Sequence, residues 1–304
     1  MRFETDRPRR LLLLLARMII AATAVSACDG RISRSGREAN GRPRIISLAP
    51  AITETLFALG AGAAVVGVSR YCDYPPEVAK LPKIGTFLTP NIEAIAGLRP
   101  TLIIGLEHSS DLREIRALKA MGYRTLMVDD DSIAGIEGSI RTIGDAIGRS
   151  REAQALLDQI HLKIGAIEER LGNVPQRRVL MLVGHQPMVA VGRGTYLDEL
   201  LTLARATNIA AASAQTWPRL SVEYIIATRP EVILDGQMGT DPATPSTFWA
   251  KYPSIPAVRD HRVFGYPDDP VLHPGPRIVL TLAMLARMIH PEAFSPESQS
   301  SQST

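Results

Sequence analysis

The sequence predicts an α/β protein made of two related lobes, each with a central sheet flanked by helices. Short apolar runs alternate with amphipathic stretches through most of the 304 residues, which is typical of parallel strands covered by helices. One helix-strand segment occurs twice. Between the two copies, a long stretch with helical apolar spacing predicts a single helix that joins the lobes.

The N-terminal lobe is expected over residues 44–140. Its apolar runs are short and rich in Ile, Val and Leu, and Gly or polar residues separate them from the amphipathic stretches. The elements follow in the order strand 44–48, helix 52–59, strand 65–68, helix 92–97, strand 101–104, helix 112–121 and strand 125–128.

Residues 141–175 are expected to form linking helices. Within them, residues 150–171 place apolar side chains at spacings of three and four, which predicts a helix about 33 Å long. A helix of this length joins two lobes rigidly and limits hinge motion. The apolar positions are Leu156, Leu157, Ile160, Ile164, Ile167 and Leu171.

The C-terminal lobe is expected over residues 176–294, with a strand at 178–183, a helix at about 197–204 and a strand at 232–234. Residues 91–104 align without gaps to residues 221–234. Each copy begins with a helix N-cap residue, has a glutamate two places on (Glu93 and Glu223), and carries Arg-Pro at the helix-to-strand turn. We interpret the match as an internal duplication, although two amphipathic helix-strand units resemble each other to some degree without common origin.

The first 28 residues form a basic segment, an apolar stretch and a run of small residues, which together predict a signal peptide. Val25-Ser26-Ala27-Cys28 resembles the bacterial lipobox, in which the cysteine is acylated after cleavage. In the alternative, an ordinary signal peptide is cut near Ala27, and Cys28 is free or paired with Cys72, the only other cysteine. Residues 29–43 predict a flexible tether, and residues 295–304 a disordered tail.

Composition and motifs exclude several classes of function. The net charge of +3 owes much to arginines near the start, and no basic run is interleaved with aromatic residues, so nucleic-acid binding is not expected. No catalytic or phosphate-binding motif is present, and the histidine spacing builds no metal site, so we expect no catalytic residue, metal or cofactor. The alternative is a metal-dependent periplasmic enzyme that uses His108, His185, Cys72 and Asp269.

Large aromatic side chains lie in segments held away from regular structure by Pro and Gly. Tyr71 and Tyr74 flank Asp73, Phe87 follows Gly85-Thr86, and Trp217 precedes Pro218. Such rings either line a ligand cleft, where they stack on flat or macrocyclic ligands, or cap the core of their own lobe.

At these residues the sequence resembles the periplasmic-binding family that serves ABC importers of cobalamin and ferric siderophores, and it is most similar to the cobalamin-binding branch. The resemblance covers nearly the whole folded region. It is carried by residues 44–54, 66–76, 91–105, 217–230 and 276–278.

The resemblance implies two α/β lobes joined by one long helix, a ligand cleft between them and little closure on binding. It assigns ligand contacts to Tyr71, Phe87 and Trp217, although Phe87 replaces a larger indole, and Leu106 and Val189 stand where the branch has further aromatic contacts. His273 stands at the position of a charged contact, with Asp269 just before it. The cleft therefore has fewer rings than the branch, which leaves the choice of ligand open.

The resemblance also implies that Glu93 and Glu223 dock against arginines of a membrane permease. A carboxylate in a first helical turn is favoured by the helix dipole as well. We expect the extracytoplasmic substrate-binding component of an ABC importer, a monomer at the periplasmic or cell-surface face of the cytoplasmic membrane, anchored by lipid on Cys28. Its ligand would be cobalamin or a related metal chelate, and a ferric siderophore or haem is the alternative.

Overall fold

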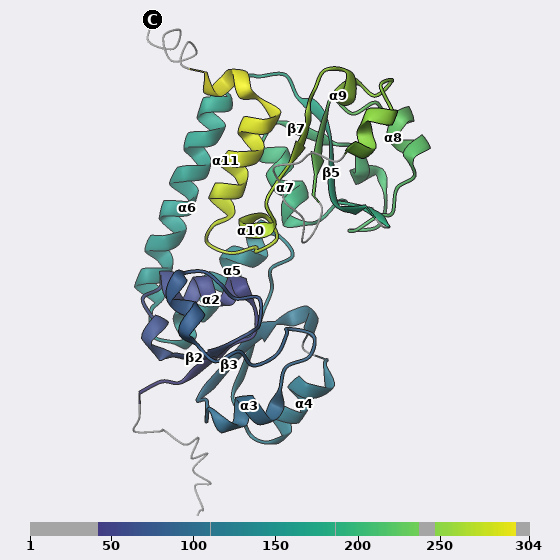
Figure 1. The fold of residues 1–304 in the computed structure, drawn as a ribbon. Helices are drawn as coiled ribbons and strands as arrows, with labels where there is room; N and C mark the ends of the chain where they lie inside the picture. The colour runs from purple at the N-terminus through teal and green to yellow at the C-terminus, as the bar shows by residue number, and fades with distance from the viewer. Residues whose placement is uncertain (1–41, 110, 186, 237–246, 296–304) are drawn as a thin grey trace, which may run out of the picture. The chain divides into compact units, whose positions relative to one another are not determined.

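Two β-sheets organise the chain, and the helix α6 (Ser150–Leu171) separates them in sequence (Figure 1). The computed structural model describes residues 42–109, 111–185, 187–236 and 247–295. The predicted signal peptide with Cys28, most of the tether and the tail after residue 295 lie outside the described residues. The chain from Pro43 onward belongs to one compact unit.

The first sheet has the strand order β2-β1-β3-β4, and all its strand pairs are parallel. Parallel neighbours need crossover connections, and helices supply them between β1 and β2 and between β3 and β4. The elements are β1 (Ile45–Ser47), α2 (Pro50–Ala58), β2 (Val65–Val68), α3 (Ile92–Gly97), β3 (Leu102–Leu106), α4 (Arg113–Ala120) and β4 (Thr125–Val128), with short 3-10 turns at Gly62–Ala64, Pro76–Lys80 and Glu107–Ser109.

The second sheet has the order β6-β5-β8-β9, with β7 also paired to β5. The sequence pattern favoured parallel strands and predicted no strand at residues 188–190, where β6 runs antiparallel to β5. Two residues separate these strands, which is enough for a hairpin and too few for a crossover. The elements are β5 (Arg177–His185), β6 (Met188–Ala190), α7 (Tyr196–Leu203), β7 (Ala206–Asn208), α8 (Val222–Thr228), β8 (Val232–Asp235), α9 (Pro256–Arg259), β9 (Val263–Gly265), α10 (Asp268–Val271) and α11 (Ile278–Ile289), with 3-10 turns at Ile209–Ala212, Thr247–Lys251 and Pro291–Phe294.

Both faces of each sheet are buried by apolar contacts. Successive strand residues point to opposite faces, so Ile45 and Ile46 belong to different apolar clusters, as do Leu180 and Met181. The cluster that contains Ile45 and Met181 also includes residues of α6, and thus runs through both halves of the chain.

The long helix α6 matches the predicted residues 150–171 and packs against α5 (Ile133–Ala146) and α11. Its buried side chains include Leu157, Ile160 and Ile164, members of the predicted apolar stripe. The helix is thus supported along its length by neighbours from both halves.

The duplicated segments have the same structure in detail. Asn91 and Ser221 cap α3 and α8 with their side chains. Arg99 and Arg229 both adopt the left-handed conformation, with φ of 47° and 49°. Residues 91–99 and 221–229 also share one burial pattern, so the repeat seen in the sequence extends to backbone geometry.

Within the described residues, no helix combines the length and apolar character that crossing a membrane requires.

Candidate functional site

The carboxyl edge of the first sheet contacts the second half of the chain. Ala51, just after β1, lies so close to Gly275 that a Cβ added to this glycine would be 3.2 Å from the α-carbon of Ala51. The backbone carbonyl of Asp131, which follows β4, accepts a hydrogen bond from the Tyr196 backbone N–H at 2.7 Å. Ligand sites of open α/β sheets occur at this edge, so the predicted site residues belong near it.

The predicted aromatic residues are placed in loops of both halves, and two of them are strongly exposed. Tyr71 is 53% and Trp217 43% exposed, which is unusual for rings of this size. Phe87 is partly buried, and its ring meets the edge of His108 at a centroid distance of 6.3 Å. Among the described residues, no contact joins the three rings to one another. Tyr71 and Trp217 therefore remain available to a ligand.

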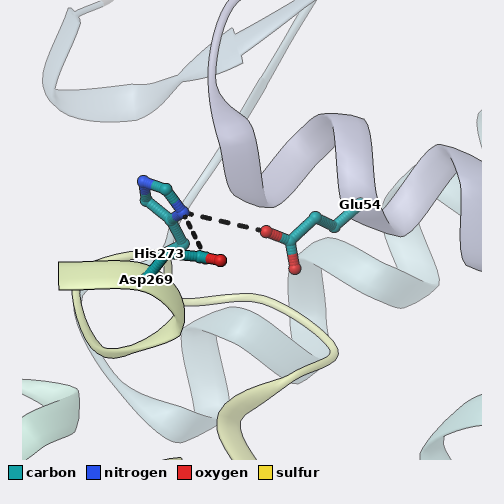
Figure 2. Close-up of side chains that lie close together, drawn as sticks. All are labelled: Glu54, Asp269 and His273. Carbon is teal, nitrogen blue, oxygen red and sulfur yellow. Dashed lines mark hydrogen bonds and ion pairs between the residues drawn. The ribbon is translucent and has the colours of Figure 1, made fainter. Parts of the chain in front are cut away.

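The predicted polar residues Asp269 and His273 lie together with Glu54, as Figure 2 shows. His273 Nδ1 is 3.0 Å from Asp269 Oδ1 and 3.9 Å from Glu54 Oε1. Arg277 donates to both Glu54 oxygens, at 2.8 and 2.6 Å, and to both Asp269 oxygens. The Tyr74 ring covers the guanidinium at 4.0 Å from its centroid. These residues form a closed polar network, which we call the Arg277 cluster.

Burial and neighbouring positive charge shift the pKa values of the carboxyl groups in the Arg277 cluster in opposite directions. Burial raises the pKa of Glu54 above its ordinary value, in spite of the hydrogen bonds and charge of Arg277. Burial also opposes ionisation of the more exposed Asp269, but Arg277 and His273 outweigh it and lower the pKa of that carboxyl. Both acids raise the pKa of Arg277, although its own burial opposes them.

The donor atoms of Glu54, Asp269 and His273 lie within 4.8 Å of one another, a spacing that suits a metal ion. Arg277 already supplies a cation to the two carboxylates, so a metal ion would have to displace it. Local sequence patterns did not identify Glu54 or Arg277 as site residues, although both lie in stretches that carry the family resemblance. Their sequence separation, 223 positions, is why local patterns did not connect them.

A second polar group lies after β3 and β4. His108 Nδ1 is 3.7 Å from Asp130 Oδ1, and Asp131 is close enough to complete a possible set of metal ligands. Asp130 also lines a small apolar pocket with Leu106 and Val128, which is closed on another side by Pro274 and Gly275. Burial, with help from neighbouring Asp131 and Asp129, raises the pKa of Asp130 to about 6, although His108 opposes this shift.

A third polar group lies at the carboxyl ends of β5 and β8. His185 Nε2 is hydrogen-bonded to Asp235 Oδ1, and the Trp249 indole N–H donates to Asp235 Oδ2 at 3.0 Å. Asp235 is fully buried, whereas the His185 side chain keeps 16% exposure. The sequence pointed to His185 but gave no sign of Asp235 or Trp249, because an acid at the end of a buried strand has no local signature.

Cys72 is a buried free thiol. Its sulfur lies 3.1 Å from the hydroxyl oxygens of Thr53 and Ser69. Burial raises the pKa of the thiol, in spite of these hydrogen bonds. A protonated, enclosed thiol is a poor nucleophile, which weakens the enzyme hypothesis at this residue.

Glu93 and Glu223 occupy the same place in the two copies of the repeat. Each is exposed and lies in the first turn of its helix, next but one to the capping residue. A backbone hydrogen bond and the Ser221 hydroxyl lower the pKa of Glu223, so this carboxylate is charged at neutral pH.

Comparison with known proteins places these features in context. A model described as "Periplasmic binding protein" matches residues 45–270. A vitamin B12-binding protein of Salmonella paratyphi A is 29% identical over 81% of this chain and 90% of its own length. An uncharacterized ABC transporter substrate-binding lipoprotein of Bacillus subtilis, YvrC, is 32% identical over 83% of this chain and 81% of its own length.

Two solved structures show the same architecture. The periplasmic heme-binding protein RhuT of a Roseiflexus species, in its apo form, has a TM-score of 0.74 and 31% identity, and the match covers 83% of this chain and all of that one. The periplasmic vitamin B12 binding protein BtuF of Vibrio cholerae has a TM-score of 0.73 and 25% identity over 83% of this chain and 98% of that one. The two-lobe α/β fold predicted from the sequence is confirmed by these matches.

Because the ion pair of the Arg277 cluster is buried, we expect its disruption to lower the stability of the protein strongly. Arg277→Ala should lower the free energy of unfolding by about 3–5 kcal/mol, because it leaves the buried Glu54 carboxylate without its cation. Glu54→Ala should cost less, because Asp269 still pairs with Arg277. Only 3% of the Glu54 side chain is exposed. Chemical denaturation measures the change, and the exposed pair Arg259 and Asp260 supplies the control, Arg259→Ala, which should change little. Equal effects for the two arginine variants would contradict the prediction.

The raised pKa of Asp130 predicts that the free energy of unfolding depends on pH. Because its folded pKa is raised from an ordinary 3.8 to about 6, the folded state favours the protonated form. The contribution of Asp130 to stability is full below pH 3.8 and is lost as the pH rises through 6.

Asp130→Asn should therefore raise the free energy of unfolding at pH 8 by about 2–3 kcal/mol, a gain that shrinks toward pH 4. Denaturation of both proteins across this pH range checks the effect, and Asp111→Asn, at an exposed position, is the matched control. A gain independent of pH would rule out titration of Asp130 as the cause.

Proposed function

This chain belongs to the periplasmic binding protein family, and we propose that it captures cobalamin or a related metal chelate and delivers it to a membrane permease. It is the substrate-binding component of an ABC importer, in keeping with its relatives. We infer the class of ligand from the aromatic side chains. The supporting observation is that Tyr71 and Trp217 are exposed in loops of opposite halves of the chain.

Exposed rings on both halves suit a large, flat ligand. Each ring offers an apolar face, and a macrocycle held between two such faces buries far more apolar area than a small polar solute does. Phe87 adds a third ring beside His108. Asp269 and His273 supply polar contacts, because their side chains keep 39% and 18% exposure in spite of the Arg277 cluster. Related structures include heme-binding and vitamin B12-binding proteins, so haem remains the second candidate.

Members of this family are binding proteins, and we propose that this chain carries out no chemistry. The groups an enzyme would use are otherwise engaged. Cys72 is a buried thiol, Asp269 is paired with Arg277, and His185 is paired with Asp235.

The protein acts outside the cytoplasm, as periplasmic binding proteins do. We propose that lipid on Cys28 holds a monomeric protein at the membrane, with residues 29–43 as a tether. The support is the lipobox-like Val25-Ser26-Ala27-Cys28 and the lipoprotein name of the relative YvrC. Anchoring would raise the local concentration of the binding protein near its permease.

Tryptophan fluorescence tests the ligand. Trp217 is exposed and Trp249 is buried, so the Trp217→Phe variant retains a buried fluorophore as an internal reference. Titration of the wild type with cobalamin, haem and a ferric siderophore should quench Trp217 with one of the macrocycles. Trp217→Ala should weaken that ligand about 10-fold, the equivalent of about 1.4 kcal/mol of lost stacking. If none of the three ligands binds, the metal-chelate proposal is wrong.

Charge reversal tests delivery. We expect Glu93→Lys combined with Glu223→Lys to abolish uptake in cells, because two carboxylates that meet arginines of the permease become repulsive. Ligand affinity of the purified variant should stay within about twofold of the wild type. Glu152→Lys, at another exposed first-turn acid, is the control. Normal uptake by the double variant would refute docking through these residues.

A further inference from the structure

We propose that Arg277 positions the ring of Tyr71 for the ligand, and that it acts through the ring of Tyr74. Arg277 and Tyr74 are positioning residues in this arrangement, since neither needs to touch the ligand. The inference rests on the function proposed above, in which the exposed Tyr71 ring stacks on a metal chelate. It makes the affinity of a ring in the first half depend on a residue of the second half.

The Arg277 guanidinium is held rigidly between the two halves of the chain. It donates to both oxygens of Glu54 on α2, at 2.8 and 2.6 Å, and to both oxygens of Asp269 on α10. Only 14% of the Arg277 side chain is exposed. A planar fork with two bidentate partners has little freedom to turn, so a side chain that packs on its face is held in place as well.

Tyr74 packs on this face of Arg277. The centroid of its ring lies 4.0 Å from the central carbon of the guanidinium, which is the distance of a cation–π contact. Tyr74 is 44% exposed, so burial in the core of the first half does not fix its ring. The contact with Arg277 therefore ties this ring to the second half.

The backbone around Tyr71 is anchored to the first half. The Arg70 N–H donates to the Gly85 carbonyl at 2.7 Å. On the other side of Tyr71, the carbonyl of the buried Cys72 accepts a hydrogen bond from the Lys83 ammonium. The Tyr71 residue itself is 53% exposed, so its backbone is held while its ring stays available.

The chain then returns to the surface and meets the second half. Residues 73–75 belong to no helix or strand, and Asp73 is exposed. The Tyr74 ring, three positions after Tyr71, links this stretch to Arg277. One guanidinium thus contacts Asp269, a proposed ligand contact of the second half, and through Tyr74 also the segment that carries Tyr71.

The contact between Tyr74 and Arg277 affects binding by pre-organisation. A ligand binds the fraction of molecules whose rings are in place, and the apparent Kd is the intrinsic Kd divided by that fraction. A cation–π contact at a partly exposed site shifts such an equilibrium by about 3- to 10-fold. Loss of the Tyr74 ring should therefore weaken binding by this factor, although no ligand contact is removed.

The test compares Tyr74→Leu with Tyr74→Phe. Both variants leave the hydrogen bonds of Arg277 to the two carboxylates in place, so both should fold. Cobalamin, haem and ferrichrome are titrated against each protein, with binding followed by the quenching of Trp217. Tyr74→Leu should weaken the ligand that wild type binds by about 3- to 10-fold. Tyr74→Phe keeps the aromatic face, so its affinity should stay within about twofold of wild type.

A double-mutant cycle with Tyr71→Ala distinguishes positioning from other roles. If Tyr74 acts through Tyr71, then Tyr74→Leu should change affinity by less than about twofold once the Tyr71 ring is gone. If Tyr74 contacts the ligand directly, the two losses should add. Phe294→Leu is the control, because Arg170 and Arg287 lie over its ring at 4.8 and 5.4 Å. It removes the same kind of contact beside the C-terminal end of α6, and it should bind like wild type.

The possible failures are distinct. If wild type binds none of the three ligands, the proposed function fails and this inference fails with it. If wild type binds one of them and Tyr74→Leu binds it equally well, or if the loss adds fully to that of Tyr71→Ala, the contact with Arg277 does not position Tyr71. The inference alone is then overturned.

Discussion

The ion pair between Arg277 and Glu54 joins parts of the chain that are far apart in sequence. Glu54 belongs to α2, beside the first sheet, whereas Arg277 immediately precedes α11. Replacing a buried pair of this kind by apolar residues of similar volume often costs no stability. Its value here is geometric, since a bidentate guanidinium fixes both distance and angle. Asp269 and the ring of Tyr74 contact this guanidinium directly, and His273 is held through its contact with Asp269.

The ion pair between Arg277 and Glu54 also limits which nearby side chains can contact a ligand. A ligand that sought Asp269 would compete with an arginine already in place, so charge recognition there is restricted. Tyr71 and Trp217 have no such commitments, and their exposure makes stacking the main source of affinity that these side chains offer. In the proposed function, stacking on these two rings would favour ligands with broad apolar faces, and the polar residues near Arg277 would have a smaller effect on the choice of ligand.

Much of the fold could be predicted because it is encoded in local patterns. The helix over residues 150–171 and the strands over residues 65–68 and 125–128 match the structure at both ends. The repeat alone placed Glu93 and Glu223 in equivalent first turns, as the structure has them. The site was less predictable, since Glu54 meets Arg277, and His185 meets Asp235, only through tertiary contacts. The antiparallel β6 was missed because a run of three residues carries little periodicity. The roles of Tyr71, Phe87 and Trp217 stay predictions.

The duplicated segments carry a consequence for whatever binds them. Asn91 and Ser221, Glu93 and Glu223, and Arg99 and Arg229 repeat not only in sequence but also in capping, burial pattern and backbone conformation. One molecule therefore offers two near-identical contact surfaces, one on each copy of the repeat. A partner that engages both with equal geometry needs two near-identical receiving surfaces, and the economical source of these is a pair of like subunits. The internal symmetry of a single chain would then be matched by the symmetry of a homodimer.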